Sequence, residues 1–326
     1  MATTARNTQR GFVLVVTLWV LAVITIAASY FAERVSRSIE LARQKKDATE
    51  QLVEFANTRA EILFRLGTSG VSLYGWGGFA LDDRPYRGSG EDIVRLQDNR
   101  GLLNLNFPQT AMMSKLLGQL GVPAEKRDAM IDTLLDYTDT DDLRRLNGAE
   151  APEYAALGLP PPPNDWLASP YQLNNIIGWR GQPELLRHLL RFVTASRILG
   201  FNPNTAPAPV LASLPGGSPE TAAALIKARN EKPLYMTGQL AGFTSGALDP
   251  DYFLFYPGNS IRITQQSAKL PWAAQYSVTL TPRSQDAPWR VDYYVKTPVP
   301  YPTENVDKIQ KLPARNPASP SADETP

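Results

Sequence analysis

Five carboxylates lie close together in the stretch DYTDTDDLRRLNGAE, where they occupy positions 136, 139, 141, 142 and 150. Oxygen-rich clusters around a turn suit calcium, which takes six to eight oxygen ligands at flexible angles. A second interpretation is an acidic loop at the end of a helix, neutralised by Arg144 and Arg145. The residue pattern alone favours this second interpretation and leaves calcium binding open.

The spacing of these carboxylates partly fits a calcium-binding EF-hand loop. Asp139, Asp141 and Glu150 fall at loop positions one, three and twelve. Positions five and six hold Leu143 and Arg144, where an EF-hand has a ligand and an invariant glycine. The EF-hand is therefore excluded, and any metal site here has a different geometry.

Composition excludes several other chemistries. The chain has no cysteine, which rules out disulfides, thiolate zinc sites, iron-sulfur clusters and a cysteine nucleophile. The single histidine, His188, lies in a leucine-rich helical stretch without a recognisable nucleophile or orienting group, so we assign it no role. No P-loop or GxSxG elbow is present, and an anchored periplasmic hydrolase with paired carboxylates is kept only as an alternative.

A long helix is predicted at the N-terminus. Residues 11–32 carry no charge and would span about 33 Å as a helix, enough to cross a bilayer core of roughly 30 Å. Apolar residues then recur at three- and four-residue steps, without proline or glycine before Gly67, a natural helix stop. We expect one helix over 12–66; the alternative is a secretory signal with IAAS at 26–29 as its cleavage site and a cut near Ala28.

The rest of the chain indicates an α+β fold. Alternating residues predict strands in 67–106 and 250–297, notably Ile261/Ile263, Tyr276/Val278/Leu280 and Val291/Tyr293/Val295. Between them, 107–249 has helical segments, among them ASRILG at 195–200, and divides into subdomains at about 107–198 and 199–249. A Pro/Ser-rich tail, 298–326, is expected to be disordered. The sequence thus predicts a small antiparallel sheet with a large all-helical insertion.

The N-terminus resembles the prepilin signal of type IV pilins and type II secretion pseudopilins. Arg10-Gly11-Phe12 precedes the apolar run, and the resemblance implies that a prepilin peptidase removes residues 1–11 by cutting between Gly11 and Phe12. Most such subunits have glutamate at the fifth mature position, which here is Val16. In lacking this glutamate, the sequence resembles the K-type minor pseudopilins (general secretion pathway protein K), which are thought to lie at the filament tip.

Four further motifs match the K-type signatures in the same order: DNRGLLNLN (98–106), LLDYTDTDD (134–142), NGAEAPEY (147–154) and FNPNTAPAPVLASLP (201–215). The resemblance implies a pilin-like fold, in which the long helix packs on the sheet. It also implies structural calcium held by Asp136, Asp139, Asp141 and Glu150.

The function implied by the resemblance is non-enzymatic. The protein would be a single-pass protein of the bacterial inner membrane with its head in the periplasm, and it would move to the pseudopilus tip on assembly. There it would initiate the filament and support export across the outer membrane. Its partners would be the I- and J-type minor pseudopilins, the major pseudopilin and the prepilin peptidase.

Residues 201–243 also resemble the helix-hairpin-helix modules of DNA-binding competence proteins. Phosphate binding requires a basic surface, but Lys227, Arg229 and Lys232 are balanced by Glu220, Glu231 and Asp249. The glycine hairpin ends in Pro219, which has no N–H to donate. Over the whole chain, 33 Lys and Arg face 32 Asp and Glu. The sequence therefore favours no nucleic-acid partner.

Overall fold

A computed structural model describes residues 10–73, 75–90, 92–244, 249–301 and 309–313. The chain divides into two compact units, Met1–Val53 and Glu54–Pro326. The first is helical over its described part. The second contains the sheet and the remaining helices, and we call it the head.

Helix α1, Arg10–Thr68, begins in the first unit and ends in the head. In the described chain it is the one helix long and apolar enough to cross a membrane. Thr17 and Thr25 donate their hydroxyls to backbone carbonyls one turn earlier, at 2.9 and 2.7 Å, so they remain compatible with an apolar span. Gly67 does not stop the helix, which ends at Thr68. Residues 1–9 of the expected leader lie outside the described residues.

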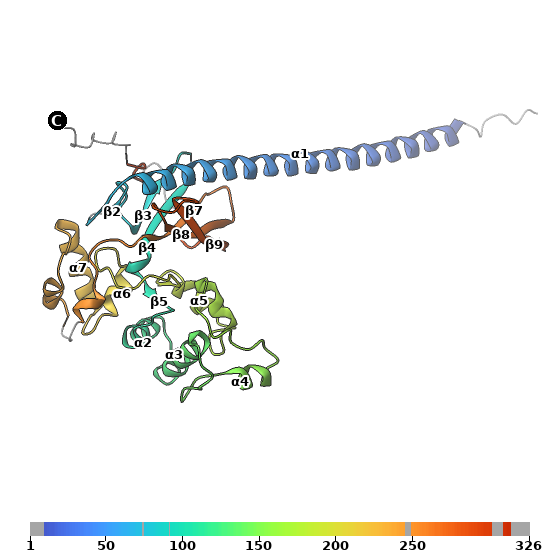
Figure 1. Cartoon of the computed structure of the whole chain (residues 1–326). Helices are drawn as coiled ribbons and strands as arrows, with labels where there is room; N and C mark the ends of the chain where they lie inside the picture. The colour runs from blue at the N-terminus through green and yellow to red at the C-terminus, as the bar shows by residue number, and fades with distance from the viewer. Residues whose placement is uncertain (1–9, 74, 91, 245–248, 302–308, 314–326) are drawn as a thin grey trace, which may run out of the picture. The chain divides into compact units, whose positions relative to one another are not determined.

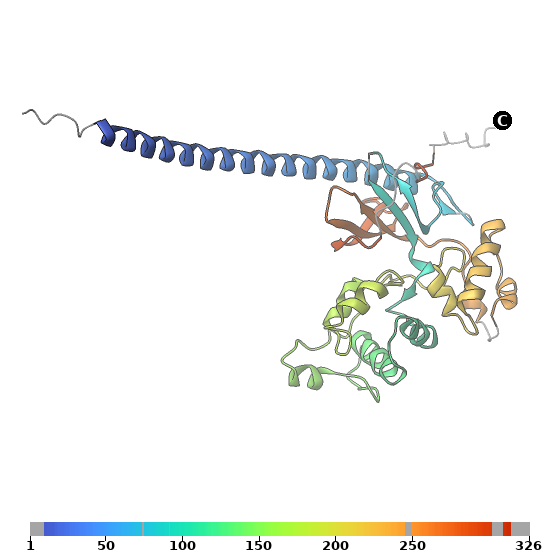
Figure 2. The same cartoon turned by 180° about the vertical axis from the view of Figure 1, so that it is seen from behind.

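The head contains the expected antiparallel sheet, in the spatial order β3-β4-β7-β8-β9. Its strands are β3 (Asp82–Arg87), β4 (Ile93–Asp98), β7 (Ser260–Gln266), β8 (Trp272–Leu280) and β9 (Trp289–Pro298). Neighbours in space are also neighbours among these strands along the chain, with the helical insertion between β4 and β7. Figures 1 and 2 show this split sheet from opposite sides. The α+β prediction is confirmed.

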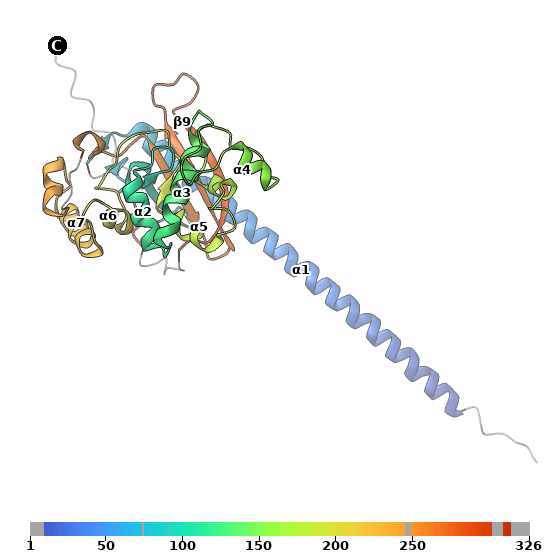
Figure 3. The same ribbon diagram turned by 90° about the horizontal axis from the view of Figure 1, so that it is seen from below.

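Two groups of helices follow β4. The first comprises α2 (Thr110–Gln119), α3 (Ala124–Thr138), α4 (Ala151–Ala156) and α5 (Pro183–Leu189). The second comprises α6 (Ala208–Ala212) and α7 (Pro219–Glu231). From below, α6 and α7 lie to one side of α2, α3 and α5, and α4 lies to the other (Figure 3). Short two-stranded sheets complete the head: β1 (Val71–Ser72) with β2 (Gly75–Trp76), and β5 (Leu103–Asn104) with β6 (Val193–Thr194).

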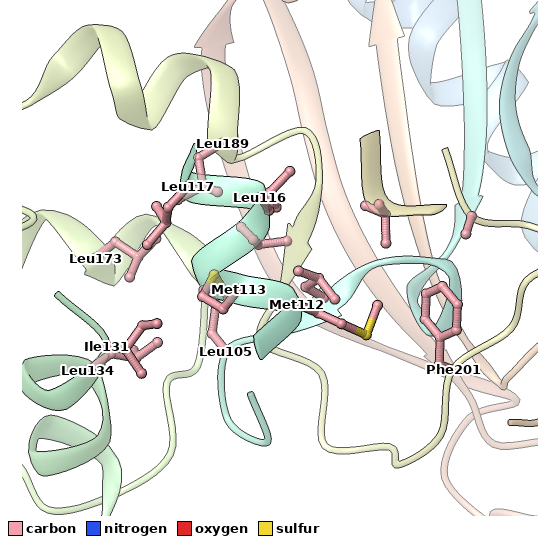
Figure 4. Packing of buried hydrophobic residues seen from close by; sticks show 14 of the residues in the cluster. Leu105, Met112, Met113, Leu116, Leu117, Ile131, Leu134, Leu173, Leu189 and Phe201 are labelled. Atoms are coloured by element: carbon pink, nitrogen blue, oxygen red, sulfur yellow. The ribbon is translucent and has the colours of Figure 1, made fainter. Parts of the chain in front are cut away.

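The head has two hydrophobic cores. One face of the sheet packs on the last turns of α1, where Ile62, Leu63 and Leu66 are buried against Val94, Ile261 and their neighbours. The second core lies inside the insertion, and Figure 4 shows Met113 and Leu117 on the side of α2 that faces Leu134 and Leu173. Each core stabilises its own layer, because apolar burial is favourable wherever it occurs.

The expectations for residues 195–200 and for the tail are wrong in detail. Residues 195–200 form no helix: Asn104 Nδ2 donates to the carbonyls of Ser196 and Ile198, at 2.9 and 3.1 Å, and so holds this segment beside β5. Two described residues of the tail are ordered, contrary to this expectation. Tyr301 is buried, and Lys311 forms a backbone β-bridge with Arg87 of β3. Residues 302–308 and 314–326 of the tail lie outside the described residues.

One buried carboxylate joins the sheet to the insertion. Asp98, at the end of β4, is 0% exposed. Its Oδ1 accepts hydrogen bonds from the backbone N–H groups of Arg100 and Gly258, both at 3.0 Å. Its Oδ2 accepts from Asn202 Nδ2 at 3.0 Å and Thr205 Oγ1 at 2.9 Å. Two of the signature motifs, those beginning at Asp98 and at Phe201, therefore meet at a single side chain.

We expect Asp98→Asn to destabilise the head. The asparagine amide would direct N–H groups toward groups that already donate, and a buried unsatisfied donor costs about 1–3 kcal/mol. Urea unfolding of the full-length protein in detergent, followed by tryptophan fluorescence, measures the loss. The exposed Asp286→Asn is the control and should match the wild type. Equal midpoints for D98N and the wild type would contradict the assigned role.

Candidate functional site

The acidic loop connects α3 to α4. Helix α3 ends at Thr138 with Asp139 as its C-cap, and Glu150 precedes α4 as its N-cap. The Glu153 carboxylate accepts the Glu150 backbone N–H at 2.9 Å, which fixes the start of α4. The loop is therefore held at both ends by helix termini, and its carboxylates lie between them.

Asp136 and Asp139 are brought together by one arginine. Asp136 is fully buried, and Arg145 Nη1 donates to its Oδ1 at 2.6 Å and also to Asp139 Oδ2. The backbone N–H of Arg145 donates to Asp136 Oδ2 at 3.2 Å. A Cβ on Gly148 would lie 1.8 Å from Asp136 Oδ2, so only glycine fits at this position. The glycine of the NGAE motif is thus explained by the close approach of a carboxylate.

Glu150 carries the strongest electrostatic signal in the loop. Its side chain is 3% exposed, and neither carboxylate oxygen has a hydrogen-bond partner. Burial, and then the negative charges of Asp136, Asp139, Asp142 and Asp141, raise its pKa to about 7. Asp139 Oδ1 is also buried without a partner. The site therefore has more buried carboxylate oxygen than positive charge to neutralise it.

Asp141 lies at the exposed side of the loop. Its Oδ1 accepts the Leu143 N–H at 2.8 Å. Asn164, which the sequence analysis did not identify, donates Nδ2 to the Asp141 carbonyl at 3.0 Å and to Asp142 Oδ1 at 2.9 Å. The Oδ1 of Asn164 is another buried oxygen without a partner. Asn164 is distant in sequence and follows a proline run, so the spacing of the acidic residues gave no signal for it.

The predicted ligands are thus only partly gathered. Asp136 and Asp139 both bind Arg145, and their negative charges act on Glu150. Asp141 instead accepts a hydrogen bond within its own turn. Within the described ranges, no three carboxylates or histidines form a ready metal cluster. The partnerless oxygens of Asp139, Glu150 and Asn164 are hard donors of the kind that calcium prefers.

The backbone N–H groups of the hairpin considered for DNA binding donate to nearby residues of the chain. The Gly217 N–H bonds to the Leu214 carbonyl at 2.8 Å, and the Ser218 N–H bonds to Thr221 Oγ1 at 2.6 Å. Arg229, one of the three basic residues, is 8% exposed and donates to the carbonyls of Pro203 and Ala206. These contacts make the hairpin a packed turn and give no support to phosphate binding.

The predicted processing and assembly residues lie at the start of α1. Gly11 and Phe12 are in its first turns, and Val16 follows one turn later. Phe12 is 73% exposed and Val16 is 43% exposed. His188 lies on the exposed side of α5. None of these positions contributes to the acidic loop.

Two family models match this chain. Residues 93–197 match the family model T2SSK_1st, and residues 201–246 match the model T2SSK; both are described as type II secretion system (T2SS), protein K. No curated protein is significantly similar in sequence. A chain in the crystal structure of the GspK-GspI-GspJ complex from enterotoxigenic Escherichia coli is 14% identical, with a TM-score of 0.50. The alignment covers 80% of this chain and 99% of that chain, and at this identity it concerns the fold.

The raised pKa of Glu150 predicts a pH dependence in metal-free buffer. Its pKa rises from the ordinary 4.5 to about 7 on folding, so protonated Glu150 stabilises the fold below pH 4.5, and this contribution is lost as the pH rises through 7. The melting temperature of the wild type minus that of Glu150→Gln should therefore fall between pH 4.5 and 7 and stay constant above it. Differential scanning fluorimetry in EDTA measures this. A flat or rising difference would refute the assignment.

Proposed function

The chain belongs to the type II secretion system protein K family, and we propose from this premise that it is the minor pseudopilin that begins the pseudopilus and remains at its tip. In this role it supports protein export across the outer membrane. Its contribution is structural and not enzymatic. The observation that carries the proposal is the pairing of protein K domains in the head with a long helix whose first part is apolar and exposed.

The apolar start of α1 supports membrane anchoring. Large side chains from Phe12 to Phe31 are exposed, several by 60% or more. Exposed apolar area costs roughly 25 cal/mol per Å² in water, so this surface requires lipid or other apolar helices. We propose that a prepilin peptidase cuts between Gly11 and Phe12, that the helix spans the inner membrane once, and that the head faces the periplasm.

Val16 supports a position at the tip. A carboxylate at this depth in a membrane is unfavourable unless a neighbouring group compensates it, and in a filament that group would belong to an adjacent subunit. A subunit with valine at this position needs no such neighbour. The head, of about 270 residues, would have a radius of gyration near 18 Å, which is bulky for repeated stacking but acceptable at one end.

The proposed partners are the I- and J-type minor pseudopilins and, below them, the major pseudopilin. The structurally similar Escherichia coli chain comes from a complex named for GspK, GspI and GspJ. We carry that association over to this chain as a proposal. Contacts between apolar helices and between heads would hold the complex together while the filament grows beneath it.

Co-expression with I- and J-type partners tests this function. The full-length chain should co-purify with both in detergent as one complex by size-exclusion chromatography with light scattering. Val16→Glu should weaken the complex because it adds an uncompensated charge to the helix interface, whereas Val16→Ala should leave it intact. A wild-type chain that elutes alone at micromolar concentration would contradict the proposal.

We also propose that the acidic loop holds structural calcium. Asp136, Asp139, Asp141 and Glu150 would supply the carboxylate oxygens, and the free Oδ1 of Asn164 is a further candidate. A divalent cation would neutralise the loop and fix it between α3 and α4. Arg145, half-exposed at this position, is the cationic group that already occupies the space between Asp136 and Asp139.

Calcium should raise the melting temperature of the full-length protein. At a hundred times the dissociation constant, a ligand specific for the folded state adds about 2.7 kcal/mol, or roughly 5–10 °C for a head of this size. Glu150→Gln should lose most of this gain, and the remote, exposed Glu231→Gln should keep it. The measurement is a fluorimetric melt after EDTA treatment, with and without calcium. An unchanged wild type would remove calcium from the proposal.

A further inference from the structure

The chain returns to the sheet after its last strand. Strand β9 forms one edge of the sheet and β3 forms the other. Shortly after β9 ends at Pro298, Tyr301 is only 8% exposed and contacts β3 and β4. Residues 310–312 then pair with Arg87, the last residue of β3. We call residues 299–301 and 309–313 the C-terminal strap.

Tyr301 is the most firmly held residue of the strap. Its hydroxyl donates to Asp83 Oδ2 on β3. The Arg95 guanidinium of β4 lies 4.2 Å from the ring centroid, and that of Arg191, which follows α5, lies 4.7 Å away. Cation–π contacts of this kind contribute more when they are shielded from water. Tyr301 therefore joins the sheet to the first helical group.

The second part of the strap pairs with the end of β3. The Arg87 N–H donates to the Gln310 carbonyl at 2.8 Å, and the Leu312 N–H donates back to the Arg87 carbonyl at 3.2 Å. Arg65 of α1 donates Nη1 to the Pro313 carbonyl at 2.6 Å. An exposed strand edge invites pairing with other chains, and these two bonds cover it at Arg87, the last residue of β3. The strap is thus attached at two separate places.

The surface between the sheet and the first helical group includes several polar contacts. Arg262 of β7, 2% exposed, donates to the carbonyls of Leu190 and Arg191 at 2.9 and 2.7 Å. Tyr171 donates its hydroxyl to Gln275 Oε1 of β8 at 2.7 Å. These hydrogen bonds carry part of the attachment between the sheet and the first helical group, so a further contact across it should have a measurable effect on local opening.

Asp83 has a backbone conformation that depends on its neighbours. Its φ of 67° is in the left-handed region, which is unfavourable for a residue with a side chain. Its carbonyl accepts from Arg95 Nη1 at 2.6 Å, and its carboxylate accepts from Tyr301. The turn in β3 is thus kept in place partly by the strap.

We propose that the C-terminal strap is a conformational latch. While Tyr301 lies between Arg95 and Arg191, it holds the α2–α5 region against the sheet. When Tyr301 leaves, that region can shift on its polar interface, and the β3 turn loosens. The latch is a property of the head itself and does not depend on the role of the protein in secretion.

Hydrogen–deuterium exchange of the full-length protein in detergent tests the latch. Tyr301→Ala removes two ring contacts and a hydrogen bond, so exchange in 82–87 and 189–198 should rise at least about tenfold, while α7 and β8 stay unchanged. Tyr301→Phe keeps the ring and loses the hydroxyl, so it should affect 82–87 alone. Arg191→Leu should affect 189–198 alone. The exposed Tyr256→Ala is the control.

Three results would overturn the latch. The first is that Tyr301→Ala exchanges hydrogen for deuterium at the same rate as the wild type. The second is a uniform rise through the head, including α7, which would show general destabilisation. The third, decisive if Tyr301→Ala does not fold, is that Tyr301→Phe and Arg191→Leu fail to separate the two segments.

Discussion

The buried Asp98 carboxylate organises the head. It lies at the point where the chain leaves the sheet, accepts from Gly258 just before the chain returns as β7, and accepts from Asn202 and Thr205 at the start of the second helical group. A long insertion costs entropy to close, and its two ends must be fixed for β4 and β7 to pair. Burial raises the pKa of Asp98, and its four donors oppose that effect. Because this one carboxylate accepts four hydrogen bonds, it holds the end of β4 next to the start of β7. The sheet therefore stays continuous although the insertion separates these two strands in sequence.

The two faces of the sheet then take different roles. The face toward α1 is apolar and is stabilised by burial of Ile261, Ile263 and Tyr276. The opposite face carries Arg262 and Gln275, which bind carbonyl and hydroxyl groups of the insertion. Hydrogen bonds are directional and apolar packing is not, so the first face fixes the layer and the second fixes the orientation of the insertion. Because the polar face sets the orientation of the insertion, the contacts that Tyr301 of the strap makes on this side can affect that orientation.

Periodicity predicted the parts of the fold that are governed by local pattern. The long helix and the alternation in β7 and β8 are confirmed, because each follows from a repeat of apolar residues. The alternation expected for Val291 and Tyr293 fails: a bulge pairs Val291 with Val278 but Tyr293 with Ser277, so the two side chains face opposite sides. Long-range contacts such as Asn104 with Ser196, or Asn164 with Asp142, leave no periodic trace in the sequence.

The acidic loop shows what the residue types could and could not indicate. Its density of carboxylates was visible in the sequence, but their burial was not. Asp136 and Asp139 lie at the C-terminal end of α3, where the helix dipole is already negative, so further negative charge there is unfavourable. Arg145 neutralises part of that charge. The pKa of Glu150, raised to about 7, indicates that negative charge remains in the loop. Positive charge at this place, from Arg145 or from a proton on Glu150, therefore stabilises the loop.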